Sequence, residues 1–310
     1  MRIVFFGTPE FASICLQKII ETNHTICAVV TVPDKEKGRG KKKSFSPVKG
    51  SALYHKLRVL QPENLRVESF INQIKNIEFD VGVVVAFRIL PREVYNLAPR
   101  GMFNLHGSLL PKYRGAAPIQ WSLINGDKET GLTTFFLQDK VDTGNIILQE
   151  KVKIEEEDDF GTLHDRMAQF GSDLIIKTLE KISSGEVKTE AQNNSLASNA
   201  PKITKEMCLI NWSKASTDIH NLVRGLSPIP AAYTIFNNKI VKIFKTKISD
   251  INSTLTPGCF EIADDKLFVH TGYKKILIEI LQIEGRKKMT ISDFLRGYRF
   301  ADSNVKKFES

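Results

Sequence analysis

Cysteine is scarce in this sequence, with four residues among 310, and the four lie far apart without a CxxC pair. Small secreted domains that depend on disulfides carry many closely spaced cysteines, so the sequence argues against that class of protein. The chain also lacks a run of about 20 apolar residues that could span a membrane. Its first residues, MRIVFFGTPEF, contain no apolar segment followed by a small-residue cleavage site. We therefore expect a cytoplasmic protein with no membrane partner.

Two common nucleotide-binding fingerprints are missing as well. The first turn after an apolar strand reads FGTPEF, with one glycine instead of GxGxxG, and Pro9 removes a backbone N–H that would meet a pyrophosphate. The segment GRGKKKS at 38–44 lacks the GxxxxG spacing of a P-loop. The sequence therefore argues against a dinucleotide-dependent dehydrogenase. It contains no cluster of Cys or His, so we expect no metal.

The N-terminal half alternates strand-like and helical segments. RIVFFG and TICAVVTV flank PEFASICLQKIIETN, whose apolar residues recur at helical spacing, with Thr8 as the expected cap and Pro9 in the first turn. Further on, DVGVVVAF is a continuous apolar run, which is typical of a strand buried on both faces. This alternation predicts an α/β fold with a doubly wound, Rossmann-like parallel sheet.

The sequence pattern changes after a long amphipathic helix that ends near residue 185. Residues 188–205, KTEAQNNSLASNAPKITK, are small and polar and indicate a linker. Beyond it, short β-branched runs such as IVKIFKTKI, KLFVHT and KKILIEILQI predict a small antiparallel β-barrel of the OB type. We therefore predict an N-terminal domain over 1–187 and a C-terminal β-barrel domain over 206–310.

Positive charge is concentrated in two places. The last 110 residues carry 18 Lys and Arg against 11 Asp and Glu, which is +7 of the total +9 and favours an extended polyanionic partner. Residues 34–49 hold seven Lys and Arg in sixteen positions. Composition alone fits a solvated loop, but the segment follows a strand of the predicted sheet and could grip phosphates at the ligand edge. Both interpretations stay open.

Polar residues crowd the end of one apolar strand, in the stretch NLHGSLLPKYRGAAP at 104–118. Asn104 and His106 share a strand face by alternation, and the glycine and proline that follow turn the backbone away so that a ligand can reach them. Downstream, the strand TTFFL leads into a polar turn with Asp142, which we expect at the same ligand edge of the sheet. A lone histidine at a strand end is more often structural than catalytic, so the residues alone leave both roles open.

These motifs resemble those of the folate-dependent formyltransferases. HGSLLPKYRGAAPIQWSLINGD matches the longest motif of that family, and the Asn-x-His and Asp-x-Gly elements match as well. The resemblance covers nearly the whole chain and includes FFGTPEFA, VPDKEKGRGKKKSFSPVK, NLVRGLSPIPAAYT and GRKKMTISDFLRG, which are similar to the branch that acts on charged initiator tRNA. One departure is AFRILP, with Arg88, where this branch often has AYGxILP.

The resemblance implies formyl transfer from 10-formyltetrahydrofolate, a cosubstrate, to the α-amino group of methionine on charged initiator tRNA. It implies that the catalytic residues are Asn104, His106 and Asp142. It implies folate contacts at Arg88, Ile89, Leu90, Ser108, Leu109, Leu110, Pro111 and Gln138, although a backbone cap of the turn explains Ser108 equally well. It implies tRNA contacts at Arg39, Lys41, Lys42 and Lys43. We expect the enzyme to be a monomer.

Three other functions are consistent with part of the sequence. A formyltransferase for an amino sugar or a small ribonucleotide would share the three catalytic residues but leaves the basic C-terminal region and the basic loop unexplained. A 10-formyltetrahydrofolate hydrolase would use water as the acceptor. A non-catalytic tRNA-binding module is disfavoured, because Asn104, His106 and Asp142 are all present.

Overall fold

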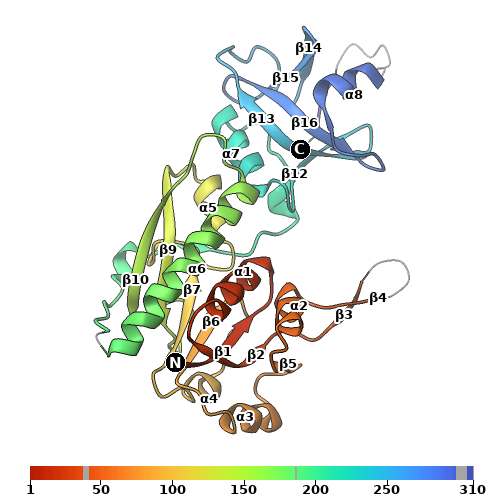
Figure 1. Ribbon diagram of the computed structural model, residues 1–310. Helices are drawn as coiled ribbons and strands as arrows, with labels where there is room; N and C mark the ends of the chain where they lie inside the picture. The colour runs from red at the N-terminus through yellow and green to blue at the C-terminus, as the bar shows by residue number, and fades with distance from the viewer. Residues whose placement is uncertain (38–41, 186, 298–305, 310) are drawn as a thin grey trace. The chain divides into compact units, whose positions relative to one another are not determined.

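The computed structural model describes residues 1–37, 42–185, 187–297 and 306–309. The chain divides into two compact units (Figure 1). The first unit comprises Met1–Pro118, Thr130–Lys153 and His164–Ala200, and the second comprises Ile119–Glu129, Ile154–Leu163 and Pro201–Ser310. Most of the first unit comes from the N-terminal part of the sequence, and most of the second comes from the C-terminal part. However, two short segments from the N-terminal part of the sequence belong to the second unit.

The first unit is built on a seven-stranded sheet with the order β10-β9-β7-β6-β1-β2-β5. Its strands are β1 (Arg2–Gly7), β2 (Thr25–Val30), β5 (Val59–Leu60), β6 (Val81–Val85), β7 (Met102–His106), β9 (Glu129–Phe136) and β10 (Ile146–Lys153). The pairs β1–β2, β1–β6, β2–β5 and β6–β7 are parallel. The predicted parallel core is therefore confirmed.

Helices cover both faces of this sheet, as the continuous apolar strands require. The helices are α1 (Glu10–Ile20), α2 (Pro47–Tyr54), α3 (Glu68–Lys75), α4 (Arg92–Tyr95) and α6 (Phe160–Ser184). On one face, Phe6 of β1 shares a buried cluster with Phe70 of α3 and Val94 of α4. On the other face, a Cβ added to Gly171 of α6 would lie 2.8 Å from the Leu105 side chain, so the helix packs closely on β7. The unit is doubly wound, as predicted.

The predicted cap of the first helix is wrong by one residue. Helix α1 begins at Glu10, and its N-cap residue is Pro9, which is extended and makes no side-chain capping bond. Pro9 is itself extended, with ψ −178°, so Glu10 is the first helical residue and the N-cap position falls at Pro9 instead of Thr8. The Glu10 carboxylate in the first turn favours the start of the helix through the helix dipole instead.

The second unit contains an antiparallel sheet with the order β12-β13-β16-β15-β14, and β17 pairs with β16. Its strands are β12 (Ala232–Phe236), β13 (Lys239–Ile248), β14 (Phe260–Ala263), β15 (Lys266–His270), β16 (Lys275–Ile283) and β17 (Met289–Thr290). The helices of this unit are α5 (Pro118–Ile124), η2 (Glu206–Cys208), α7 (Ser216–Leu226) and α8 (Ile291–Gly297).

The C-terminal tail closes this sheet into the predicted small barrel. Glu309 forms a bridge with Ile235 of β12, and Lys307 forms a bridge with Cys259 directly before β14. These are the two edges of the strand order, so the tail joins them. Between these bridges, Phe308 is buried and stacks on Trp212, with ring centroids 5.7 Å apart.

Residues 188–200 lie on the first unit. Asn194–Leu196 form a 3₁₀ turn (η1), and Asn199–Ala200 form β11, which pairs in parallel with β8 (Arg114–Gly115). Glu190 also forms an antiparallel bridge with Ile146. These contacts hold the segment against the stretch that follows β7.

The basic segment forms a short antiparallel hairpin of β3 (Lys35–Lys37) and β4 (Lys42–Ser44). Arg39 and Lys41 lie outside the described residues, and only the backbone of Lys42 and Lys43 is described. Over the described residues, every helix is too short or too polar to cross a lipid bilayer. All four cysteines are free thiols.

Candidate active site

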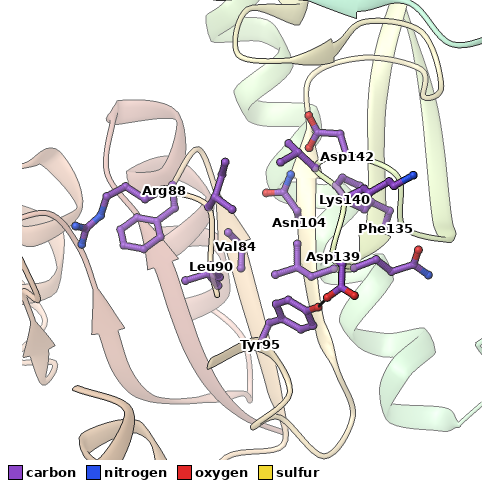
Figure 2. A pocket seen from close by; sticks show the side chains of 14 residues that line it. Val84, Arg88, Leu90, Tyr95, Asn104, Phe135, Asp139, Lys140 and Asp142 are labelled. Atoms are coloured by element: carbon purple, nitrogen blue, oxygen red, sulfur yellow. Dashed lines mark hydrogen bonds between the residues drawn. The ribbon is translucent and has the colours of Figure 1, made fainter. Parts of the chain in front are cut away.

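A pocket in the first unit lies between the segments that follow β6 and β9 and includes residues of β7 (Figure 2). Asn104 and Asp142 both line it, and they come from strand β7 and from the turn after β9. The complete lining consists of Val84, Phe87, Arg88, Ile89, Leu90, Tyr95, Asn104, Phe135, Leu137, Gln138, Asp139, Lys140, Val141 and Asp142. The walls are therefore mainly apolar, with a few polar groups that can orient a ligand.

His106 is not among the lining residues of this pocket and is 6 % exposed. Its Nε2 atom lies 2.8 Å from the Tyr113 carbonyl oxygen. A carbonyl only accepts hydrogen bonds, so Nε2 carries a proton and donates it. The other ring nitrogen, Nδ1, lies 3.8 Å from Asp142 Oδ2. The histidine therefore faces Asp142 with the ring nitrogen that does not bond to Tyr113.

The Asp142 carboxylate is held by the main chain. The Gly115 N–H donates to Asp142 Oδ2 over 2.9 Å, and the Asp142 side chain is 11 % exposed. Asp142 also has a positive φ of 54°, a region that aspartate tolerates better than most residues. The structure thus brings Asn104, His106 and Asp142 together.

The expectation that the strand TTFFL ends at the ligand edge is wrong. Strand β9 is antiparallel to β7, with Asn104 opposite Phe135 and His106 opposite Thr133. The end of β9 therefore lies at the amino end of β7, and the turn 137–144 runs back to reach His106. A Cβ added to Gly144 would lie 1.7 Å from the Phe136 carbonyl oxygen, so this tight return requires glycine.

The residues predicted to contact folate separate into two groups. Arg88, Ile89, Leu90 and Gln138 line the pocket, whereas Ser108, Leu109, Leu110 and Pro111 are not among its lining residues. Ser108 is fully buried, and its hydroxyl donates to the Lys112 carbonyl oxygen over 2.6 Å. That bond is the backbone cap that the sequence offers as the other explanation of this serine.

Arg88 anchors the loop after β6 and points away from the pocket (Figure 2). Its guanidinium donates to the carbonyl oxygens of Pro62 and Glu63, over 2.7 and 2.8 Å. Burial lowers the pKa of Arg88 from its usual value. This arginine therefore shapes the loop, and a ligand would meet the backbone of residues 88–90 instead of the Arg88 charge.

Sequence reasoning missed Tyr95 as a lining residue. The Tyr95 hydroxyl donates to Asp139 Oδ1, and this bond raises the pKa of Tyr95. Asp139 Oδ2 also lies 3.8 Å from Arg92. Tyr95 and Asp139 are 44 residues apart, and no local motif marks Tyr95, so only the fold reveals the contact. The described residues contain no group of three or more His, Cys, Asp or Glu that could hold a metal ion.

The chain belongs to the formyl transferase family. Residues 1–179 match the family Formyl transferase, and residues 202–299 match Formyl transferase, C-terminal domain. Among curated relatives, the chain is 43% identical to a protein of Caldanaerobacter subterraneus subsp. tengcongensis over 309 residues, which cover 99% of this chain and 100% of the relative. It is 45% identical to a protein of Clostridioides difficile over 96% of this chain and 97% of the relative. Both relatives are named methionyl-tRNA formyltransferase.

Solved structures show the same fold at lower sequence identity. One is the sugar 3N-formyl transferase WlaRD, crystallised in the presence of dTDP and 5-N-formyl-THF. It matches with a TM-score of 0.69 at 23% identity, over 93% of this chain and 99% of that chain. At this identity, the match supports the fold and leaves the acceptor substrate to other observations.

Proposed function

We propose that this chain transfers the formyl group of 10-formyltetrahydrofolate to the α-amino group of methionine on charged initiator tRNA. The observation that carries the proposal is the pocket, which Asn104 and Asp142 line together, with His106 Nδ1 lying 3.8 Å from Asp142 Oδ2. Membership of the formyl transferase family and the full-length relatives named methionyl-tRNA formyltransferase support the same reaction.

The residues present fit a folate ring system. Phe87, Leu90 and Leu137 offer apolar walls for the faces of a flat ring, and the backbone of 88–90 and 138–142 offers polar groups for its edge. The cavity encloses about 110 Å³. Small-molecule sites commonly enclose about 300–1,000 Å³. The cavity therefore accommodates one end of the donor, and the rest of the folate would extend outside it.

Asn104 is the candidate for stabilising negative charge on the formyl oxygen. The donor supplies an activated formyl group, and attack by an amine moves negative charge to its oxygen. Within the described part of the chain, the Asn104 side chain lines the pocket without a hydrogen-bond partner. Its amide is thus available to donate to that oxygen, an interaction worth about 3–4 kcal/mol where similar donors have been removed.

Asp142 is the candidate for accepting the proton that the attacking amine must lose. Its carboxylate lines the pocket, and Nδ1 of His106 lies 3.8 Å behind it. Because Nε2 already carries a proton, a second proton on Nδ1 would make the ring an imidazolium, which would face the carboxylate and stabilise its charge. The pair could therefore move the proton from the amine toward the leaving nitrogen of the donor.

The distribution of charge supports tRNA as the acceptor. The last 110 residues carry +7 of the net +9, and a tRNA is the extended polyanion that such a surface favours. Arg39, Lys41, Lys42 and Lys43 remain the proposed contacts from the basic hairpin.

One assay tests the proposal against its alternatives. The purified chain is incubated with 10-formyltetrahydrofolate and, separately, with methionyl initiator tRNA, an amino sugar nucleotide, a small amino ribonucleotide, or water alone. We expect formyl-methionyl-tRNA as the main product. Formate without formyl-methionyl-tRNA would indicate a hydrolase, and a formylated small acceptor would indicate the other transferases. We further propose a cytoplasmic monomer, and sedimentation of the purified chain tests its oligomeric state.

A further inference from the structure

The segment 188–200, named here the strap, contacts the backbone on both sides of the candidate active site. Gln192 is half-buried, and its amide Nε2 donates to two carbonyl oxygens, those of Asp142 over 3.0 Å and Gly144 over 2.8 Å. Both acceptors belong to the tight turn that carries the Asp142 carboxylate. The Gln192 amide therefore ties the strap to the turn at two points.

The orientation of the Gln192 amide is fixed by Arg114. Gln192 Oε1 accepts from Arg114 Nε over 3.0 Å and from Nη2 over 2.6 Å. A guanidinium only donates, so Oε1 must face it and the Nε2 donors must face the turn. Asn194 Oδ1 accepts a further bond from Arg114 Nη2, which holds the guanidinium from the strap side.

The same strap also supports the partner of His106. The Tyr113 N–H donates to Ser198 Oγ over 2.9 Å, and the Arg114 N–H donates to the Ser198 carbonyl oxygen over 2.8 Å. Tyr113 has a positive φ of 59°, which is unfavourable for a bulky residue. Its carbonyl is the group that accepts from His106 Nε2. The strap thus holds in place both the carboxylate turn and the carbonyl that orients the imidazole.

The geometry points to Gln192 as a positioning residue that holds the Asp142 turn for formyl transfer. This inference rests on the proposed function and adds a residue outside the Asn104, His106 and Asp142 constellation. In this turn Asp142 has a left-handed backbone conformation, and Gly144 leaves no room for a larger residue. The shape of the turn therefore depends on the hydrogen bonds that Gln192 makes to its carbonyl oxygens. A group misplaced by about 1 Å can cost about 100-fold in rate, so loosening this turn lowers kcat.

The sharpest variant is Gln192→Glu. Glutamate has the same shape and still accepts from Arg114, but it places a second acceptor against the carbonyl oxygens of Asp142 and Gly144. Asn193→Asp is the matched control, because it adds the same charge one residue away. Asn193 Oδ1 accepts from the N–H and the hydroxyl of Ser195, and aspartate retains both bonds.

Two readouts on the full-length protein decide the inference. In Gln192→Glu we expect kcat to fall about tenfold or more with KM for both substrates within about twofold of wild type, because a positioning defect acts on the chemical step. We also expect faster hydrogen exchange at the Gly115 amide, which donates to Asp142 Oδ2. Asn193→Asp should match wild type in both measurements.

The outcomes separate this inference from the proposed function. If the wild-type chain formylates no charged tRNA, the proposed function fails, and exchange at Gly115 still decides whether Gln192 holds the turn. Unchanged exchange at Gly115 in Gln192→Glu would overturn the inference. A kcat within about twofold of wild type, or an equal loss in Asn193→Asp, would overturn it as well.

Discussion

Each unit contains a buried histidine beside a carboxylate, and the two pairs are built in opposite ways. In the first unit, His106 Nε2 donates to a carbonyl, and Nδ1 lies 3.8 Å from Asp142. In the second unit, His270 Nδ1 accepts from the N–H groups of Thr254 and Leu255, both over 3.1 Å. Its Nε2 atom lies 3.5 Å from Glu261. The main chain therefore orients both rings, but with opposite nitrogens toward the carboxylate.

The carboxylates differ in what else they contact. Lys275 donates to Glu261 and lowers the pKa of that carboxyl group, so the charge of Glu261 is already compensated. Asp142 instead lines a cavity beside the Asn104 amide. A buried histidine and carboxylate thus do not define an active site by themselves. The open cavity and the neighbouring amide donor distinguish the pair that can meet a substrate from the pair that stabilises the barrel.

The largest expected effect is on catalysis in the first unit. His106→Gln keeps an amide that can donate to the Tyr113 carbonyl but removes the Nδ1 atom that faces Asp142. We expect kcat to fall by about 100-fold or more, the usual contribution of a general acid or base. Asn104→Ala and Asp142→Ala should fall by a similar factor. Steady-state kinetics with charged tRNA provide the measurement.

His270→Asn is the control for this prediction, because an asparagine oxygen can still accept near the Nδ1 position. Its kcat should equal that of wild type. Near-normal turnover in His106→Gln would mean that both histidines are structural and that the contrast between the units is wrong.

The second effect is on stability and belongs to the barrel. His270→Ala removes the fully buried ring that accepts from the N–H groups of Thr254 and Leu255, and the loss of two hydrogen bonds, at about 0.5–1.5 kcal/mol each, costs about 1–3 kcal/mol. We expect the free energy of unfolding to fall by that amount while kcat, measured well below the melting temperature, stays unchanged. Urea unfolding followed by Trp212 fluorescence reports on this unit, since that residue is buried in its core. A loss of kcat with unchanged stability in His270→Ala would mean that the His270–Glu261 pair acts in catalysis, which contradicts its structural role.

The sequence predicted the fold because the fold depends on local patterns, while the catalytic roles of Asn104, His106 and Asp142 remain a proposal. The run VGVVV predicts a doubly covered strand, and alternation places Asn104 and His106 on one face of β7. The direction of β9 was not predictable, since an apolar strand such as TTFFL carries no signal for parallel or antiparallel pairing. The role of the strap was also hidden. Gln192 contacts Arg114, 78 residues away, and a polar segment reads as a linker whether or not it is bound.

The third effect concerns the basic hairpin, where we expect a substitution to change activity without changing stability. Arg39→Ala should lower kcat/KM for charged tRNA by about tenfold, because a guanidinium provides forked donors to phosphate. Arg39→Lys should restore it only in part. If Arg39 acts on tRNA alone, the free energy of unfolding should change by less than about 0.5 kcal/mol. Lys42→Ala and Lys43→Ala are the controls. Equal kinetic effects in all of these variants would reduce the hairpin to a diffuse positive patch.

The smallest effect comes from a third histidine, His220 on α7. It concerns how the stability of the fold depends on pH. Burial lowers the pKa of His220 in the folded state, while the unfolded chain keeps a value of about 6.5. Above that pH both states are neutral and His220 contributes nothing. As the pH falls below about 6.5, the unfolded state binds the proton first, so stability decreases until the folded pKa is reached.

His220→Gln should therefore reduce the loss of stability between about pH 6.5 and 5, by less than about 1.4 kcal/mol for each unit of pKa difference. The exposed His55→Gln is the control, and urea titrations at a series of pH values provide the measurement. An unchanged pH dependence in His220→Gln would show that its burial does not contribute to acid sensitivity.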